Sequence, residues 1–267
     1  MSNITTTTHW DPKDLLEFQG LHQQDGVVHV PGLVASDAMA ELLAWVDDIS
    51  NASTLGRHYF ESTDRGRVKA RTEDFAKDHP PLHQFLTQGR VRDVLEALFG
   101  EPPVLFKEKI NYKHPGAAGY APHQDAPAYP FGSLHITMLL ALDSADTSNG
   151  CLEFAKGAHP PGVLIEGMRD GCFQLGGRLN SNGRLSLGAL LETLCFFPLC
   201  TTPKAAPTPD RSAARPYVTY NASSEGDLRS GTTTTKNRRW RKGGPAINPF
   251  SGRTSPGFCL ADPPSNG

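Results

Sequence analysis

Apolar residues recur at helical spacing in three segments of the first hundred residues. Helices are therefore predicted at residues 12–23, 36–49 and 89–99. Asp11 and Ser36 stand where the first two helices begin and are expected to cap them, and Gly100 is expected to end the third. Three valines within residues 27–30 predict a short strand between the first two helices.

From about residue 102 the pattern changes to short runs rich in β-branched and aromatic residues, separated by Gly, Pro, Asn and Ser. Strands are predicted at residues 104–106, 110–112, 136–142, 151–154 and 163–165. Helices followed by short strands favour an α+β, mainly β fold, in which helices pack outside an antiparallel barrel or jelly roll.

The hydrophobic pattern lapses from about residue 190, where stretches rich in Ala, Pro and Thr begin. We expect a disordered N-terminus at 1–10, one domain at 11–228 that is distorted after about 190, and an irregular tail at 229–267.

The overall composition narrows the choice of partners. Lys and Arg number 26 against 28 Asp and Glu, so net charge gives no reason to expect nucleic acid as a partner. No apolar run reaches the roughly 18 residues of a membrane span, and the polar residues 1–10 do not resemble a secretory signal. Five cysteines without a CxxC pair are typical of reduced thiols, and a cytoplasmic location is expected.

His123-Gln124-Asp125 is the clearest candidate for metal binding. Residues i and i+2 of a strand project from the same face, so an imidazole and a carboxylate can reach one metal ion together. A second histidine from a distant strand would complete a 2-His-1-carboxylate site, which suits Fe(II) and leaves positions for a co-substrate and O2. Alone, the triplet is weak evidence in a chain with ten histidines, and its sequence context decides.

The context of this triplet resembles the phytanoyl-CoA dioxygenase family. The resemblance runs over about residues 12–165, and several motifs in the same order make it specific. The motifs are Asp25 to Val28, Val30 to Leu33, Leu105 to Lys113 (LFKEKINYK), Pro115-Gly116, Pro122 to Tyr129 (PHQDAPAY), His135-Ile136-Thr137, Asn149 to Phe154 (NGCLEF), Gly157-Ala158-His159, and later Tyr217 to Asn221 and Glu225-Gly226-Asp227.

The resemblance implies a double-stranded β-helix that uses Fe(II), with 2-oxoglutarate and O2 as co-substrates. Such an enzyme converts 2-oxoglutarate to succinate and CO2 while it hydroxylates a C–H bond of a small-molecule substrate. His123 and Asp125 carry over as metal ligands. Contacts to the co-substrate are assigned to Asn111, Arg71, Thr137, Arg211 and Arg215.

Several of these positions have a second interpretation. Arg71 is compatible with an exposed charge at the start of a helix, and His135 with a core histidine. Lys107 and Lys109 fit either contacts to an anionic substrate or strand charges that face water. A small acidic substrate, of the aminoalkylphosphonate kind, is preferred over an acyl-CoA. Oligomeric state cannot be deduced.

One metal ligand is missing. The family's second histidine lies in a later strand, within a Pro-Gly-Asp … His … Ser-Gly-Pro pattern, and an arginine further on binds the far carboxylate of 2-oxoglutarate. This chain has no histidine after His159. We hypothesise that residues from about 190 to 214, and again from about 230, are translated in a shifted frame or from a mispredicted splice.

Codon degeneracy supports that hypothesis. In the shifted frame, each new codon consists of the third base of one present codon and the first two bases of the following codon. This allows Pro-Gly-Asp at 190–193, Met-Tyr-His at 199–202, Thr-Glu-Ser-Gly-Pro at 202–207 and arginine at 212–213. The ligand, its turn and the arginine then appear in the order and at the spacing that the family shows.

Read literally, the chain favours two other functions. It fits a catalytically inactive relative that binds a ligand or partner, or a non-functional translation product. Five prolines from 187 to 216 argue against an intact central strand, which predicts a damaged second half of the barrel and poor solubility. The third interpretation is a nucleic-acid-binding tail, carried by Arg238, Arg239, Arg241 and Lys242.

Overall fold

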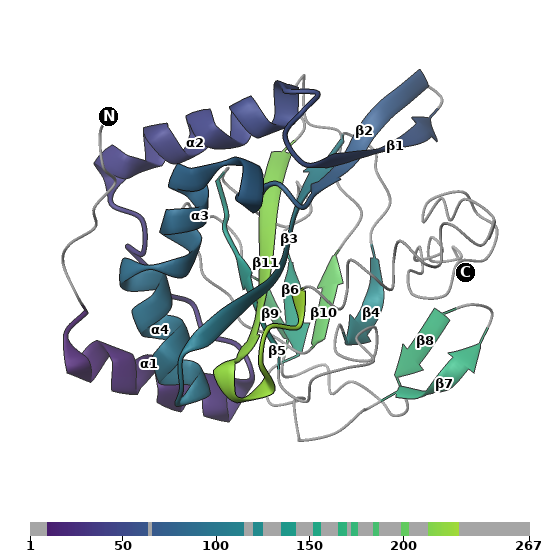
Figure 1. Ribbon diagram of the computed structural model, residues 1–267. Helices are drawn as coiled ribbons and strands as arrows, with labels where there is room; N and C mark the ends of the chain where they lie inside the picture. Colours follow the sequence, from purple (N-terminus) through teal and green to yellow (C-terminus); the bar gives the residue numbers. More distant parts are fainter. Residues whose placement is uncertain are drawn as a thin grey trace.

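The computed structural model is a helical layer packed on a five-stranded sheet, with a second sheet behind it (Figure 1). The structure describes residues 10–63, 66–114, 120–124, 135–142, 152–155, 165–169, 172–175, 184–186, 199–202 and 213–229. The expectations for residues 1–9 and for the basic tail after Arg229 lie outside this part of the chain.

Four α-helices form the first layer. They are α1 (Pro12–Asp25), α2 (Ser36–Asn51), α3 (Pro80–Thr87) and α4 (Gly89–Phe99). The Asp11 carboxylate accepts a hydrogen bond from the amide of Lys13 at 2.9 Å, as expected of a cap. Gly100 ends α4 with φ 75°, a left-handed conformation that suits glycine.

Two local predictions are wrong. Ser36 is the first residue of α2 rather than its cap, and Ala35 occupies the cap position without a side-chain hydrogen bond. Residues 27–30 form no strand, although Val27, Val28 and Val30 are buried. Their apolar side chains pack in the core, but their backbone pairs with no sheet, and hydrophobicity alone does not distinguish these cases. Helix α3 and the first two strands were not predicted.

The five-stranded sheet is antiparallel, with the order β1-β2-β3-β11-β5. Its strands are β1 (Arg57–Thr63), β2 (Gly66–Glu73), β3 (Pro103–Lys113), β11 (Ala213–Ala222) and β5 (His135–Leu139). The two runs predicted at 104–106 and 110–112 form the single strand β3. Strand β11 comes from the far end of the chain and inserts between β3 and β5.

The second sheet has the order β4-β10-β6-β9. Its strands are β4 (Tyr120–Gln124), β10 (Leu199–Thr202), β6 (Glu153–Ala155) and β9 (Arg184–Ser186), and β7 (Ile165–Arg169) pairs separately with β8 (Cys172–Leu175). Two short 3-10 turns, η1 (Ala76–Asp78) and η4 (Ser223–Glu225), follow β2 and β11.

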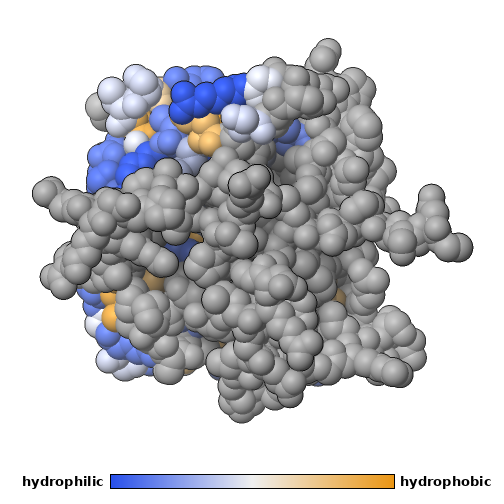
Figure 2. Space-filling model, turned by 90° about the vertical axis from the view of Figure 1, so that its right-hand side faces the viewer, coloured by the Kyte–Doolittle hydropathy of each residue, from blue (hydrophilic) through white to orange (hydrophobic). Residues whose placement is uncertain are grey.

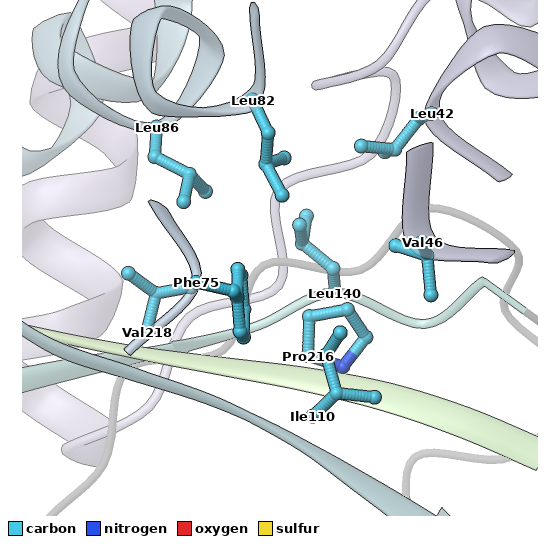
Figure 3. Close-up of a pocket in the computed structure, with 9 residues that line it drawn as sticks. All are labelled: Leu42, Val46, Phe75, Leu82, Leu86, Ile110, Leu140, Pro216 and Val218. Atoms are coloured by element: carbon cyan, nitrogen blue, oxygen red, sulfur yellow. The ribbon is translucent and has the colours of Figure 1, made fainter. Parts of the chain in front are cut away.

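The main core lies between the helices and one face of the five-stranded sheet. Buried side chains from this face include Ile110, Val218 and Met138, and they pack with apolar residues of α2 and α3. A small pocket in this layer is lined only by apolar residues (Figure 3). The pocket therefore belongs to the core and offers no polar side chain to a co-substrate.

Pro216 corrects one inference from the proline content. It lies within β11, the strand between β3 and β5, opposite Ile110. Pro216 stands one residue beyond the last β11–β5 pair, Tyr217 with Leu139, and its carbonyl accepts from the Leu140 amide at 3.0 Å. Because Pro216 stands at the end of the β11–β5 ladder, its missing N–H removes no hydrogen bond from the interior of that ladder. This central strand therefore tolerates the proline.

Figure 2 shows hydrophilic residues with small hydrophobic patches between them on the face it displays. Within the described part of the chain, no helix is long and apolar enough to cross a membrane.

Candidate functional site

The five-stranded sheet has two chemically different faces. On β11, Val218 and Tyr220 turn toward the helices and are buried there. Tyr217, Thr219 and Asn221 alternate with them and therefore lie on the opposite face, which we call the inner face. The second sheet lies on this side of the molecule (Figure 1).

The strand register aligns the inner-face residues in cross-strand rows. The first row is Arg71, Asn111 and Arg215, on β2, β3 and β11. The family resemblance assigns all three residues, which come from separate segments of the sequence, to contacts with the co-substrate. The sheet places them side by side in the backbone ladder. The next rows are Glu73, Lys109, Tyr217 and Leu139, then Lys107, Thr219 and Thr137, then Asn221 and His135.

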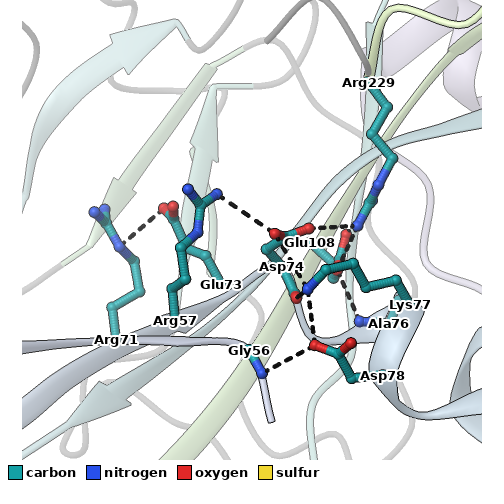
Figure 4. Close-up of polar contacts among 10 residues, drawn as sticks. All are labelled: Gly56, Arg57, Arg71, Glu73, Asp74, Ala76, Lys77, Asp78, Glu108 and Arg229. Atoms are coloured by element: carbon teal, nitrogen blue, oxygen red, sulfur yellow. Dashed lines mark hydrogen bonds and ion pairs between the residues drawn. The ribbon is translucent and has the colours of Figure 1, made fainter. Parts of the chain in front are cut away.

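Arg71 is a strand residue, so its interpretation as a charge at a helix start is wrong. Its Nε lies 3.0 Å from Oε1 of Glu73, and its side chain is only 15 % exposed (Figure 4). The guanidinium also stacks 4.7 Å from the ring centroid of Tyr59. Burial, followed by the charge of Glu73, raises the pKa of Tyr59 and keeps its phenol neutral.

Thr137 and Thr219 lie next to each other at the other end of the inner face. Their hydroxyl oxygens are 3.0 Å apart, and both residues are buried. His135 is half-buried, with its ring 5.1 Å from that of Phe106. Burial lowers the pKa of His135, the charge of Glu225 opposes this, and that of Lys107 adds to it. The imidazole is therefore neutral at pH 7.

His123 lies in β4, and Asp125 comes directly after Gln124, the last residue of that strand. Strand β10 pairs with β4 so that Cys200 stands opposite His123. The register therefore brings residues 199–202 beside the candidate ligand, although more than 70 residues separate them in sequence. These are the residues whose shifted reading allows Met-Tyr-His, and the backbone places that position in the strand next to His123.

The donors of this chain fit a 2-His-1-carboxylate iron site only in part. His123 and Asp125 supply one imidazole and one carboxylate, whereas β10 carries Leu, Cys and Thr in the present sequence. In the described part of the chain, no group of three His, Cys, Asp or Glu residues is arranged to hold a metal ion. Asp125 and Arg211 lie outside the described residues, and only the backbone is described for His123 and Arg215.

A second polar cluster lies on the side of the sheet that faces the helices. The buried carboxylate of Glu108 accepts hydrogen bonds from Nη1 and Nη2 of Arg229 and, at 2.9 Å, from the amide of Ala76 (Figure 4). Arg229 also lies 3.0 Å from Asp74, which has φ 59°. The hydrogen bonds that Arg229 donates to the Glu108 carboxylate, more than any other cause, raise the pKa of Arg229. These contacts hold the segment after β11 against β3 and η1.

The model of the family described as "Phytanoyl-CoA dioxygenase (PhyH)" matches residues 22–172. A methylphosphonate hydroxylase of Gimesia maris is 39% identical over 212 residues, which cover 77% of this chain and 80% of that protein. The chain belongs to the phytanoyl-CoA dioxygenase family.

Two further proteins extend this comparison. A 2-aminoethylphosphonate dioxygenase from the uncultured bacterium HF130_AEPn_1 is 36% identical over 217 residues, which cover 78% of this chain and 81% of that protein. The epimerase SnoN, solved with Fe3+, alpha ketoglutarate and nogalamycin RO, has a TM-score of 0.67 at 23% identity and covers 80% of this chain and 85% of its own.

EctD from S. alaskensis, solved with 2-oxoglutarate and 5-hydroxyectoine, has a TM-score of 0.64 at 16% identity over 84% of this chain and 80% of its own. These structural matches confirm the predicted fold, a cupin-like jelly roll with packed helices. Members of the phytanoyl-CoA dioxygenase family use Fe(II), 2-oxoglutarate and O2, as the resemblance implied.

Sequence reasoning missed three residues of the inner face in this family member: Glu73, Tyr217 and Thr219. A usable signal was present in β11, where Arg215, Tyr217, Thr219 and Asn221 alternate with Pro, Val and Tyr. This period of two marks one polar face and one buried face. Glu73 had no such signal, because its strand was not predicted.

Proposed function

We propose that this chain is a dioxygenase that binds 2-oxoglutarate and a small acidic molecule between its two sheets and hydroxylates a C–H bond of that molecule. Family membership supplies the reaction class. The observation that carries the site is the inner face, where residues assigned to the co-substrate from three separate segments share one cross-strand row. A cytoplasmic location, expected from the cysteine content, belongs to the same proposal.

The proposed roles follow from chemistry and register. His123 and Asp125 would hold Fe(II), which supplies the oxidation chemistry when it is bound with 2-oxoglutarate and O2. Arg71, Asn111 and Arg215 share a row that can face a carboxylate of 2-oxoglutarate with charge and amide donors. Thr137 adds a hydroxyl at the other end of the face, and Arg211 would join the same group from the segment before β11. The opposing sheet would exclude water from the bound molecules.

The test is release of succinate from 2-oxoglutarate by the full chain, with and without Fe(II). Succinate that depends on iron, and that is lost in His123→Ala and Asp125→Ala, supports the proposal. A chain that binds 2-oxoglutarate but releases no succinate under any iron supply is not a dioxygenase.

A second function is favoured by the identity of β10. Because no histidine stands in this strand beside His123, the present chain has two of the family's three protein ligands to iron. Such a chain would act as a catalytically inactive binding protein or be a non-functional product. Two ligands bind Fe(II) more weakly than three, so succinate release would then be absent.

Sequencing the gene and its transcript across codons 187–242 separates these alternatives. If sequencing reveals an insertion, deletion or missed splice, the corrected reading frame should place a histidine in β10. The restored chain should then release succinate. If the present frame is confirmed and no succinate forms, the inactive relative is the correct conclusion.

A further inference from the structure

Tyr59 lies at one border of the inner face. It belongs to β1, the edge strand of the five-stranded sheet, and stands opposite Arg71 of β2. Directly paired residues of antiparallel strands project from the same face of a sheet. Tyr59 therefore extends by one strand the row that contains Arg71, Asn111 and Arg215.

Tyr59 and Glu73 hold the Arg71 guanidinium from two directions. The ζ carbon of Arg71 lies 4.7 Å from the centroid of the Tyr59 ring, which covers one face of the planar group. The ion pair between Nε and Oε1 of Glu73, at 3.0 Å, occupies one of its edges (Figure 4). The Arg71 and Glu73 side chains are 15 % and 11 % exposed, so solvent screens this pair less than it would a surface pair.

The Tyr59 hydroxyl connects the ring to the carboxylate. Burial, followed by the charge of Glu73, raises the pKa of the phenol, and the charges of Arg57 and Arg71 oppose this. A hydrogen bond to Glu73 raises the same pKa further, because a carboxylate accepts only from the neutral phenol. Glu73 therefore accepts from Tyr59 while it pairs with Arg71, and each of the three side chains contacts the other two.

These contacts leave the far end of the guanidinium, which carries Nη1 and Nη2. Within the part of the chain that the structure describes, Arg71 makes no hydrogen bond from these two nitrogens. Two parallel N–H groups at this end match the two oxygens of a carboxylate. Asn111, the next residue of the row, has a side-chain amide that can donate to the same group.

We propose that Tyr59 is a positioning residue of the co-substrate site, which together with Glu73 holds Arg71 so that its terminal nitrogens bind a carboxylate of 2-oxoglutarate. This inference rests on the proposed function, because the contact between Arg71 and 2-oxoglutarate belongs to that proposal. An arginine side chain has many rotamers, so fixing it in advance removes an entropy cost from binding. Tyr59 acts through Arg71 and needs no contact with the co-substrate.

The experiment is calorimetric titration of the full chain with 2-oxoglutarate, with Fe(II) present and O2 excluded so that no turnover occurs. In Tyr59→Leu, the Kd should rise about fivefold or more, because the guanidinium loses the ring that covers its face. Tyr59→Phe keeps that ring, and its Kd should stay within about threefold of the parent value. If Tyr59→Leu does not fold, Tyr59→Thr provides the same test, since threonine suits an edge strand.

A double-variant cycle separates positioning from a general structural role. Arg71→Met should raise the Kd about tenfold or more, because it removes a bidentate, charge-assisted contact. Arg71→Lys should recover little of this loss, since an ammonium lacks the planar fork. In the Arg71→Met background, Tyr59→Leu should change the Kd by less than about twofold. If Tyr59 contributed only to folding, its replacement would weaken binding equally in both backgrounds.

Phe60→Leu is the matched control. The Phe60 ring centroid lies 4.4 Å from the ζ carbon of Arg67 on the same hairpin, and Phe60 is 43 % exposed. Loss of this stacking should leave the Kd within about twofold of the parent value. A Tyr59→Leu chain that binds as tightly as the parent, or an equal loss in the Arg71→Met background, overturns the inference about Tyr59 alone. A parent chain that binds no 2-oxoglutarate removes the proposed function as well.

Discussion

Removing the Arg229 guanidinium should lower the free energy of unfolding by more than the loss of a surface ion pair would. The Glu108 carboxylate is fully buried, and the Arg229 side chain that pairs with it is 24 % exposed. Replacement by methionine, Arg229→Met, keeps the apolar stem but leaves a buried carboxylate whose remaining hydrogen bond in this cluster comes from the Ala76 amide. A buried charge without its counter-charge is costly.

The expected loss is about 3 kcal/mol in the free energy of unfolding. Breaking a buried ion pair by removing one partner costs ~3–5 kcal/mol. The lower end applies here, because the Ala76 amide still donates to Glu108 and because solvent reaches part of the arginine. Combining Arg229→Met with Glu108→Gln removes the orphaned charge, so the double variant should regain about half of the loss.

Urea unfolding followed by tryptophan fluorescence measures this loss, since the chain has three tryptophans. Arg92→Met is the control, because Arg92 pairs with Glu96 on the surface of α4, where both side chains are more than 40 % exposed. That change should cost less than about 0.5 kcal/mol. The reasoning is refuted if Arg229→Met falls within the range of this control, or if Glu108→Gln brings no recovery.

Three further outcomes are expected from local geometry. Gly56→Ala should cost at least ~1 kcal/mol more than Gly32→Ala in thermal unfolding: both have positive φ, but only at Gly56 would a Cβ meet a backbone oxygen at 2.7 Å. Tyr220→Phe should cost about 1–2 kcal/mol by the same measurement, because the buried hydroxyl donates to the Leu86 carbonyl at 2.8 Å; an unchanged midpoint would contradict this. The Glu101 carboxylate accepts hydrogen bonds from the first residues after β11. These bonds, above all the one from the Ser224 hydroxyl, lower the pKa of Glu101. Its contribution is therefore present above about pH 4.3 and lost as pH falls through the lowered value, so Glu101→Gln should flatten stability between about pH 5 and 3; a parallel pH curve would argue against this role.

Local pattern predicted the elements that depend only on neighbours in sequence. The three amphipathic helices were predicted within a few residues because each needs only a 3.6-residue period and a capping signal, such as Asp11 or Gly100. The strand at 27–30 was predicted wrongly, and β1 and β2 were missed. In these segments, pairing partners rather than hydrophobicity decide whether an extended backbone becomes a strand.

The candidate site shows the same division. The His123-Gln124-Asp125 triplet could be recognised in the sequence because its two ligand types are two residues apart. Its relation to β10 could not, since strand register is a long-range property that no local pattern encodes.

The sequence by itself determined the family, the helical layer and the identity of the chemical groups, including the lack of a histidine after His159. Only the tertiary structure decided which groups meet. It inserted β11 between β3 and β5, and so placed Arg215 beside Asn111 and Thr219 beside Thr137. The physical reason is that side-chain type is fixed residue by residue, whereas a shared face depends on backbone hydrogen bonds between segments about a hundred residues apart.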